Sequence, residues 1–468
     1  MPARTDPIVL GPRAPIEGAK LPAMVPHLPP ARQPSRSAAL RAWLYVGLNS
    51  FGGPAGQVAV MHREIVERRG WMSERSFLHA LNFSMLLPGP EAQQLATYIG
   101  WRLNGVAGGL AAGLLFILPG ALVIMALSAL YALFEGTAFV DALFYGIKPA
   151  VVALVVGAVY GLARRVLAGR AAWLIAGAAF GAIFFLDIPF PVIVLGAALA
   201  GWLVARLSRR DGDSVSQPVT APDGRRVERP ATSRALTVLA VAAVLWLVPS
   251  ALAVAVLGPA SVYAQLAAFF SVAALVTFGG AYAVLAFVAQ QAVGGFGWLS
   301  AEQMLDGLGL AESTPGPLIM VVQFVGFMAA FGVSDGLDPL AAGILGGLLV
   351  TWVTFVPSFG IVLAGAPYVE YLQGQPQLTA ALRGITAAVV GVILNLGLWF
   401  GLQTVFTTTG ELRLGPLRLH TAELVTLDPV ALGLVGLSLI VLLRLRWPLL
   451  VTLGLSAAIG LGYRLAAG

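Results

Sequence analysis

Long uncharged segments alternate along the chain with short segments that carry its charges. A helix that spans a bilayer needs roughly 20 apolar residues. Uncharged runs of suitable length cover residues 106–134, 188–205, 340–369 and 384–410, and the run at 142–163 is interrupted only by Lys148. Shorter apolar runs cover residues 171–186, 430–443 and 447–463, and residues 235–301 carry no charge over a length that suits two or three spans. This pattern predicts an all-α polytopic membrane protein.

The polar segments divide the chain into domains. Residues 1–37 are rich in proline and arginine, which predicts a disordered tail. Residues 208–233 form a polar linker with several arginines. Two membrane domains are therefore expected, at residues 38–207 and 234–468. Because cytoplasmic segments are enriched in Lys and Arg, we expect both the tail and the linker in the cytoplasm.

The charged loops also predict a topology. Arg164, Arg165 and Arg170 mark one cytoplasmic loop, whereas the loops at 135–141 and at Asp187 are acidic and fit the opposite side. Between residues 104 and 259 this gives five crossings, at 105–134, 138–166, 171–186, 188–207 and 235–257. The N-terminus is then cytoplasmic and the C-terminus periplasmic. The loop at 411–427, with Arg413 and Arg418, falls outside and is an exception.

The sequence contains an internal repeat. Phe51-Gly52-Gly53 recurs as Phe278-Gly279-Gly280, and Pro88-Gly89-Pro90 recurs as Pro315-Gly316-Pro317, both at the same offset along the chain. Gly70-Trp71 and Ser73 recur at that offset as Gly297-Trp298 and Ser300. Further on, Pro119 and Pro357 are separated by a slightly larger offset, which indicates a short insertion around 333–339 in the second half. Three motifs in one register indicate a duplicated domain.

Repeat and topology together predict inverted copies. An odd number of crossings puts the start of the second copy on the opposite side of the membrane, provided that residues 40–104 return to their starting side. Inverted repeats with broken helices and a midplane site are typical of secondary transporters. A parallel repeat stays an alternative, and it requires the number of crossings to be wrong by one.

The repeated motifs are candidate substrate-binding elements. Glycine pairs and proline break a helix, and such breaks within a membrane are tolerated where they line a cavity. Pro90 and Pro317 are expected to start helices, and the free N–H groups of a helix N-terminus favour an anion. The predicted substrate-binding residues are Phe51, Gly52, Gly53, Pro88, Gly89, Pro90, Gln93, Gln94, Lys148, Phe278, Gly279, Gly280, Ser313, Thr314, Pro315, Gly316 and Pro317. The polar members alternatively bridge neighbouring helices.

Charges inside the membrane are expensive and often functional. Lys148 suits an anionic substrate, and it alternatively pairs with Asp141 or a helix end. Glu91 and Glu312 are candidate proton carriers for gating or coupling, although Glu91 also fits as a partner of the helix dipole. Arg102 is a candidate gate or a loop anchor.

Composition narrows the class of protein. Hydrophobic residues make up 58% of the chain and charged residues 11%, which excludes a soluble enzyme. The chain has no cysteine, and its four histidines do not cluster, so we expect neither a metal site nor a cofactor. The net charge of +6 resides in loops between apolar runs, which indicates membrane topology and not nucleic-acid binding. The sequence contains no Walker motif, so nothing in it indicates transport driven by ATP hydrolysis.

The ordered set of motifs resembles the chromate ion transporter (CHR) family in its long, two-domain form. The resemblance rests on Phe51-Gly52-Gly53-Pro54, Gly70-Trp71-Met72, Leu87-Pro88-Gly89-Pro90, Phe278-Gly279-Gly280 and Thr314-Pro315-Gly316-Pro317, and it covers about residues 38–466. It implies a bacterial inner-membrane exporter with two fused halves in opposite orientation and about thirteen spans. It further implies that the protein expels chromate and confers resistance, with sulfate as a related anion.

Other functions remain open from the sequence. A carrier or exchanger of sulfate or another oxyanion fits the same residues, and so does an anion channel. A membrane-embedded enzyme fits poorly, because the chain has no His/Asp cluster and no soluble catalytic domain. The expected partners are chromate, sulfate and the lipid bilayer, with a homodimer as one arrangement.

Overall fold

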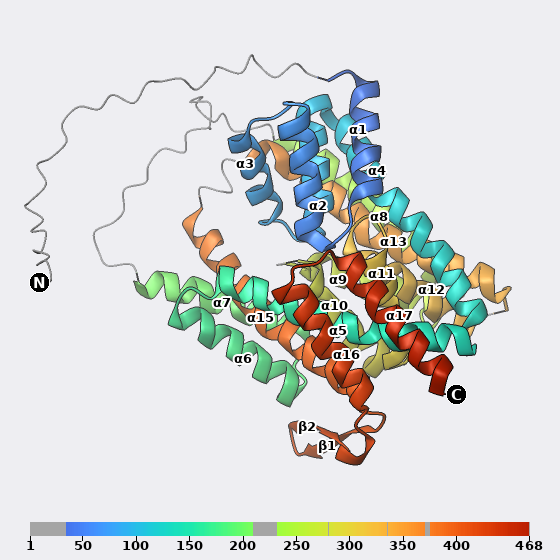
Figure 1. Ribbon diagram of the computed structural model, residues 1–468. Coiled ribbons are helices and arrows are strands. Elements are labelled where there is room, and N and C mark those ends of the chain that lie inside the picture. The colour runs from blue at the N-terminus through green and yellow to red at the C-terminus, as the bar shows by residue number, and fades with distance from the viewer. Residues whose placement is uncertain (1–33, 209–231, 279, 335, 370–374, 468) are drawn as a thin grey trace, which may run out of the picture. The chain divides into compact units, whose positions relative to one another are not determined.

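A computed structural model describes residues 34–208, 232–278, 280–334, 336–369 and 375–467 (Figure 1). Most of the predicted tail and linker, and the predicted site residue Gly279, lie outside these described residues. The described chain is helical almost throughout. It confirms the predicted all-α polytopic membrane protein.

Seven helices of the described chain are long and apolar enough to cross a membrane. They are α4 (Glu91–Phe134), α5 (Ala138–Val166), α7 (Phe190–Ser208), α8 (Thr232–Leu257), α13 (Pro339–Gly365), α15 (Pro376–Val405) and α17 (Leu449–Ala467). Shorter apolar helices are α6 (Arg170–Leu186), α9 (Val262–Val276), α10 (Ala281–Ala289), α12 (Val321–Val333) and α16 (Pro429–Leu439). Most of these helices overlap the uncharged runs of the sequence, but α4 begins at Glu91 and α15 at Pro376, before the runs at 106–134 and 384–410, and α12 lies outside the predicted runs.

Each predicted break is a break in the structure. Helix α1 (Arg36–Asn49) ends before Phe51-Gly52-Gly53, and α2 (Gly53–His62) begins at the second glycine. Gly52 and Gly53 have φ angles of 84° and 67°, which favour glycine because a Cβ disfavours the left-handed region. In the second half, α9 ends just before Thr277 and α10 begins after Gly280, whose φ is 103°.

Helix α4 consists of two arms that fold back on each other. The helical geometry is interrupted at Asn104 and Gly105. A Cβ built at Gly100 in the first arm would lie 2.5 Å from the carbonyl oxygen of Gly108 in the second arm. The glycines therefore let the two backbones approach closely. In the second half α12 and α13 pack in the same way, with Gly326 against Gly346.

The repeat extends to local structure that the sequence motifs do not include. A π-helical turn at Arg63–Arg68 recurs at Gln290–Gly295, in the same register as the motifs. Ser73 caps α3 (Glu74–Ser84), and Ser300 caps α11 (Ala301–Ser313) through the same side-chain bond to the third helical N–H. The repeat therefore includes the π-helical turn and the capped helix that follows it in each half.

A β-hairpin departs from the loop expected at 411–427. Strands β1 (Thr409–Leu414) and β2 (Leu417–Ala422) pair antiparallel, with Leu414 opposite Leu417. The reason is visible in the sequence, because apolar and polar residues alternate from Glu411 to His420 around a Gly-Pro turn.

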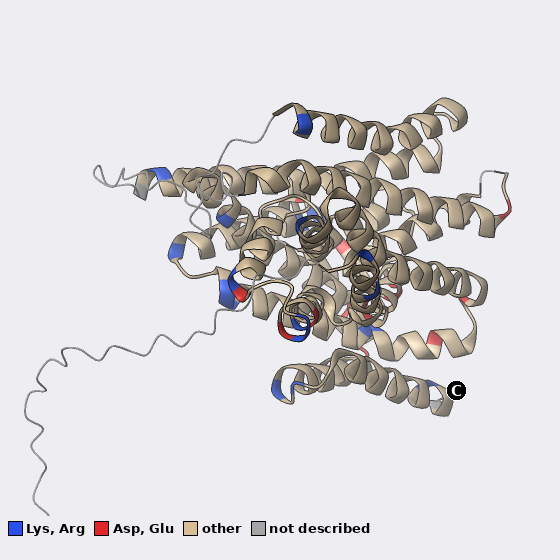
Figure 2. Ribbon diagram, turned by 90° about the horizontal axis from the view of Figure 1, so that it is seen from above, with Lys and Arg blue, Asp and Glu red and all other residues tan. Residues whose placement is uncertain are grey.

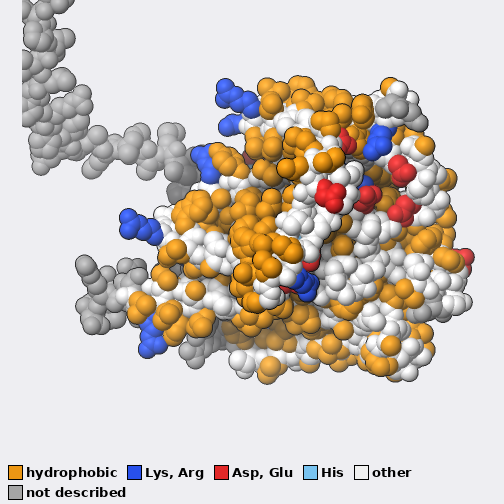
Figure 3. Space-filling view, turned by 90° about the horizontal axis from the view of Figure 1, so that it is seen from below, with side chains coloured by type: hydrophobic (Ala, Val, Ile, Leu, Met, Phe, Trp, Pro, Cys, Tyr) orange, Lys and Arg blue, Asp and Glu red, His pale blue; other side chains and the backbone are white. Residues whose placement is uncertain are grey.

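Charged residues are few along the helices. Figure 2 shows several Lys and Arg positions at the left ends of helices and several Asp and Glu positions at the right, with further positions of both signs near the middle of the view. Hydrophobic side chains cover much of the surface in Figure 3. The topology predicted from the charges of the loops stays a prediction.

Candidate functional site

The two Pro-Gly-Pro loops each contact the Phe-Gly-Gly break of the opposite half. The Gly89 N–H donates to the carbonyl of Thr277 at 2.8 Å, directly before Phe278. The Gly316 N–H donates to the carbonyl of Ser50 at 2.9 Å, directly before Phe51. The structure thus brings together the motifs that the sequence predicted to form one site.

These two hydrogen bonds are equivalent under the repeat. Gly316 is the counterpart of Gly89 and Thr277 is the counterpart of Ser50, both in the register of the repeated motifs. Contacts in which i meets j and the copy of j meets the copy of i are characteristic of a two-fold relation. These reciprocal hydrogen bonds therefore relate the two halves by a local pseudo-two-fold axis at the Pro-Gly-Pro loops.

Glycine is required in both loops. Gly89 has φ 127° and Gly316 has φ 94°, so a side chain would be strained at either position. A Cβ at Gly89 would also lie 2.5 Å from Nε2 of Gln94 and 3.1 Å from Oγ of Ser358. At Gly316 the nearest atom to a Cβ is the Cα of Gly120, at 3.2 Å.

Each loop ends at a helical turn, as the sequence predicted. Pro90 is the N-cap of α4, and Pro317 is the N-cap of a 3-10 turn (Leu318–Met320) that leads into α12. Neither cap has a side chain that accepts from the first-turn N–H groups. The free N–H groups make both turns suitable for an anion.

Buried amides and hydroxyls brace the first loop. Gln94 donates to the carbonyl of Pro88 at 2.6 Å. The Ser358 hydroxyl donates to Oε1 of Gln93 at 2.6 Å, and Nε2 of Gln93 donates to Thr97 at 2.9 Å. Gln93 and Gln94 are fully buried. Gln94 holds the loop, whereas Gln93 connects α4 to Ser358 on α13, and Oε1 of Gln94 has no partner among the described residues.

The second loop is braced from the first half. The Gln57 side chain on α2 donates to the carbonyl of Gly316 at 2.7 Å and is itself buried. The sequence motifs identified neither Gln57 nor Ser358. Ser358 directly follows Pro357, the repeat counterpart of Pro119. Its position beside this repeated proline was the one feature of the sequence that could have indicated Ser358.

The two candidate acids beside the loops differ in their surroundings. Glu312 is buried near the end of α11 and accepts a hydrogen bond from the Tyr282 hydroxyl, a partner that sequence reasoning missed. Glu91, in the first turn of α4, is partly exposed and has no hydrogen bond or ion pair among the described residues. Ser313 and Thr314 donate to carbonyls of their own helix, Leu310 and Ala311, each at 2.9 Å.

Comparison with known proteins identifies the family. The sequence model of the chromate transporter family matches residues 38–202 and 264–461. A chromate transport protein of Pseudomonas aeruginosa is 36% identical over 75% of this chain and 77% of its own length. A chromate transport protein of Cupriavidus metallidurans is 27% identical over 75% of this chain and 79% of its own. The chain belongs to the chromate transporter family.

Other relatives in such comparisons carry less specific names. An uncharacterized transporter of Methanocaldococcus jannaschii is 23% identical over 79% of this chain and 85% of its own length. No solved structure matches the chain. In this chromate transporter family member each matched segment contains one Phe-Gly-Gly break and one Pro-Gly-Pro loop.

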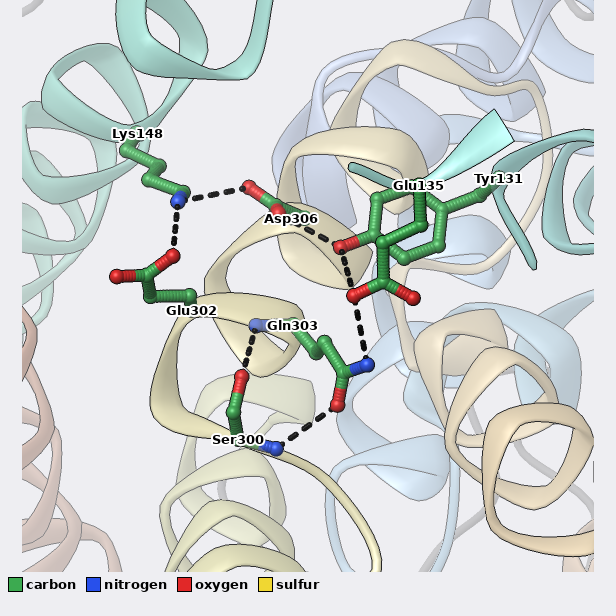
Figure 4. Close-up of polar contacts among 7 residues, drawn as sticks. All are labelled: Tyr131, Glu135, Lys148, Ser300, Glu302, Gln303 and Asp306. Atoms are coloured by element: carbon green, nitrogen blue, oxygen red, sulfur yellow. Dashed lines mark hydrogen bonds and ion pairs between the residues drawn. The ribbon is translucent and has the colours of Figure 1, made fainter. Parts of the chain in front are cut away.

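Lys148 lies in a separate polar cluster and not at the loops (Figure 4). Its Nζ on α5 is 3.4 Å from Oε2 of Glu302 and 3.7 Å from Oδ1 of Asp306, both on α11. The Tyr131 hydroxyl donates to the other oxygen of Asp306 at 2.9 Å. The sequence offered Asp141 or a helix end as the alternative partner, whereas the structure pairs Lys148 with two carboxylates of the second half. Asp306 was not identified from the sequence.

Arg102 is not brought to the loops either. It is exposed near the end of the first arm of α4 and has no hydrogen bond or ion pair among the described residues. Among those residues, no group of three or more His, Asp or Glu side chains is placed to hold a metal ion.

Proposed function

We propose that this family member is a secondary transporter that exports chromate across the bacterial inner membrane by alternating access and so confers chromate resistance. Family membership supports chromate transport across a membrane, because the similar proteins of Pseudomonas aeruginosa and Cupriavidus metallidurans are named chromate transport proteins. The observation that carries the mechanism is the reciprocal pair of hydrogen bonds between the Pro-Gly-Pro loops and the opposite breaks.

The two halves are inverted in this proposal. Five helical segments lie between the break at Gly105 and Gly258 in the described chain: the second arm of α4, then α5, α6, α7 and α8. An odd number of crossings leaves the second repeat on the opposite side of the membrane. With the arginine-rich loop at Arg164, Arg165 and Arg170 in the cytoplasm, this proposal puts the N-terminus in the cytoplasm and the C-terminus in the periplasm.

Chromate is held by backbone groups in this proposal. A tetrahedral oxyanion accepts hydrogen bonds from the N–H groups that follow Pro90 and Pro317, and the helix dipoles offset its charge. Gln94 and Gln57 hold the loops and Gln93 holds the first turn of α4 against Ser358, so the N–H groups are already oriented before the anion arrives. Lys148 is a further cation for the anion in this proposal, and an anion that reaches it competes with Glu302 and Asp306.

Alternating access follows from the symmetry of the contacts. Each loop is tied to the opposite half by one of the two equivalent bonds. Release of one bond frees that loop on its own side while the other bond holds, and exchange of the two states moves the site from one side to the other. Glu91 and Glu312 lie next to the loops, where the gain and loss of a proton couples to this exchange.

Flux measurements in inside-out vesicles test the proposal. Radiolabelled chromate should accumulate in vesicles that contain the wild-type protein, and an imposed pH gradient should change the rate. A greater rate for sulfate than for chromate would favour the oxyanion exchanger instead. Linear, non-saturating flux down the chromate gradient would favour an anion channel.

A further inference from the structure

A cavity of about 570 Å³ lies where α5 meets α6, against the end of α7 and the start of α15. It is distant in sequence from both Pro-Gly-Pro loops, and none of the proposed transport residues lines it. Its walls are formed mainly by small and aliphatic side chains, among them Ala172, Ile175, Val204 and Ala387. The walls therefore suit an apolar chain.

Two close helix contacts define the cavity. A Cβ built at Gly201 on α7 would lie 2.5 Å from the carbonyl oxygen of Ala380 on α15, and a Cβ built at Gly384 on α15 would lie still closer to the carbonyl oxygen of Ala197 on α7. Deeper along α15, Gly391 lies against the backbone of Ala176 on α6. Because Gly201 and Gly384 also line the cavity, the crossing of α7 and α15 forms its floor.

Two arginines that line the same cavity have no partner in the part of the chain that the structure describes. Arg165 and Arg383 are exposed, and neither makes a hydrogen bond or an ion pair there. No Asp or Glu is among the described residues that line the cavity. By contrast, the neighbouring Arg164 is engaged by Tyr160, with a hydrogen bond of 3.2 Å and its guanidinium 5.5 Å from the ring centre. Figure 3 shows basic side chains along one edge of a largely hydrophobic surface.

We propose that this cavity binds an anionic phospholipid. Guanidinium groups bind phosphate oxygens with paired hydrogen bonds, and basic pockets between membrane helices on the cytoplasmic side are suited to anionic headgroups. Arg165 and Arg383 hold the phosphate, and an acyl chain lies along Ala172, Ile175 and Val204. A zwitterionic headgroup carries its own cation and leaves the charge of the two arginines unbalanced.

The bound lipid connects the two halves of the protein. Arg165 and Ala172 belong to the first half, whereas Arg383 and Ala387 belong to the second. Binding to both therefore stabilises their packing by linkage, because the unfolded chain does not present the cavity. This role goes beyond transport and stands whether or not chromate is the substrate.

Native mass spectrometry of the purified full chain with added lipid tests the inference. Phosphatidylglycerol should remain bound and raise the melting temperature, whereas phosphatidylethanolamine should do so weakly. In R165Q/R383Q the affinity for phosphatidylglycerol should fall about tenfold or more, since two charge-assisted phosphate contacts are lost. R164Q is the matched control and should bind as the wild type does.

Further variants keep the test decisive if the double variant folds poorly. R165Q and R383Q alone should each weaken binding, and Ala172→Phe should fill the apolar wall and weaken it with both arginines in place. Equal retention of the two lipids, or undiminished binding by R165Q/R383Q, would overturn the proposal. Equal stabilisation by inorganic phosphate would likewise contradict a lipid as the occupant.

Discussion

The side chains around the two Pro-Gly-Pro loops come mainly from one repeat. Gln57, Gln93, Gln94 and Thr97 of the first repeat have Val284, Met320, Val321 and Phe324 as counterparts in the register of the motifs. Conversely, Tyr282 and Glu312 of the second repeat have Ala55 and Met85 as their counterparts in the first. The backbone bonds at Gly89 and Gly316 are nevertheless equivalent. The first half therefore contributes buried amides and the partly exposed Glu91 to the site, and the second contributes a buried acid with its hydroxyl partner.

This difference separates two tasks that one symmetric fold performs. Equivalent backbone contacts allow two states of similar geometry, which an alternating transporter needs. Unequal side chains allow the two states to differ in energy, so one ligand or one proton can shift their populations. We infer that the symmetric part governs access and that the asymmetric part governs coupling.

Substitution of either loop glycine should have the largest effect. Gly89→Val and Gly316→Val should reduce chromate flux in vesicles to background, because both positions have positive φ and a β-branched side chain is strained there. Gly89→Val should also insert less well, since its Cβ meets Gln94 and Ser358. Flux normalised to the amount of inserted protein is the measurement. Wild-type flux in either variant would remove the loops from the site.

Loss of Lys148 should have the next largest effect. Its repeat counterpart is Thr386, and the counterpart of Asp306 is His79. The repeat therefore contains no second copy of this ion pair. Lys148→Ala leaves the buried Asp306 without its cation and should lower stability by about 2 kcal/mol, discounted for partial exposure of the pair. The melting temperature and the dissociation constant for chromate should be measured together.

The double variant K148A/D306N separates structure from binding. It should recover most of the stability, because neither charge is left unpaired. If Lys148 also attracts the anion, chromate affinity should stay low in the double variant. Full recovery of affinity would limit Lys148 to a structural role.

Removal of the Gln57 amide should have a smaller effect. Gln57→Leu leaves the carbonyl of Gly316 without its buried donor, which costs about 1–3 kcal/mol. The melting temperature should fall and chromate flux should decrease, whereas Val58→Leu on the same helix should change neither. An unchanged melting temperature for Gln57→Leu would show that the second loop does not depend on the first half.

The smallest effect is expected at the β-hairpin, which belongs to the second half. Burial, and then the neighbouring Arg418, hold the pKa of His420 below its ordinary value of 6.5, although Glu411 opposes this. The folded protein thus binds fewer protons than the unfolded chain just below pH 6.5, so stability should decrease as the pH falls through that value. His420→Asn should flatten the pH dependence of the melting temperature. A steeper dependence in His420→Asn would contradict this assignment.

Sequence predicted the membrane helices, the repeat and the helix breaks, because each depends on local composition or on a register within the chain. Pro90 and Pro317 precede helical turns as expected, and the breaks lie at Gly52-Gly53 and before Ala281. The inverted orientation and the binding roles stay predictions. The expected loop at 411–427 is a hairpin, although its alternating pattern was present in the sequence.

Most of the missed residues have partners that are remote in sequence, whereas Tyr282 contacts Glu312 of the same half. Gln57 bonds to Gly316 and Ser358 bonds to Gln93, each across more than half of the chain. Asp306 pairs with Lys148 and Tyr131 only because α11 packs beside α5 and α4. A single polar residue in an apolar helix does not indicate which helix it faces, so the packing had to be known first.

Equilibrium binding of radiolabelled chromate to the purified protein tests the central claim most directly. The wild type should bind chromate saturably, and Gly316→Val should lose this binding while it stays folded. Gly454→Val on α17, where a Cβ meets nothing within 4 Å, is the matched control and should bind normally. Wild-type affinity in Gly316→Val would contradict an anion site at the paired loops.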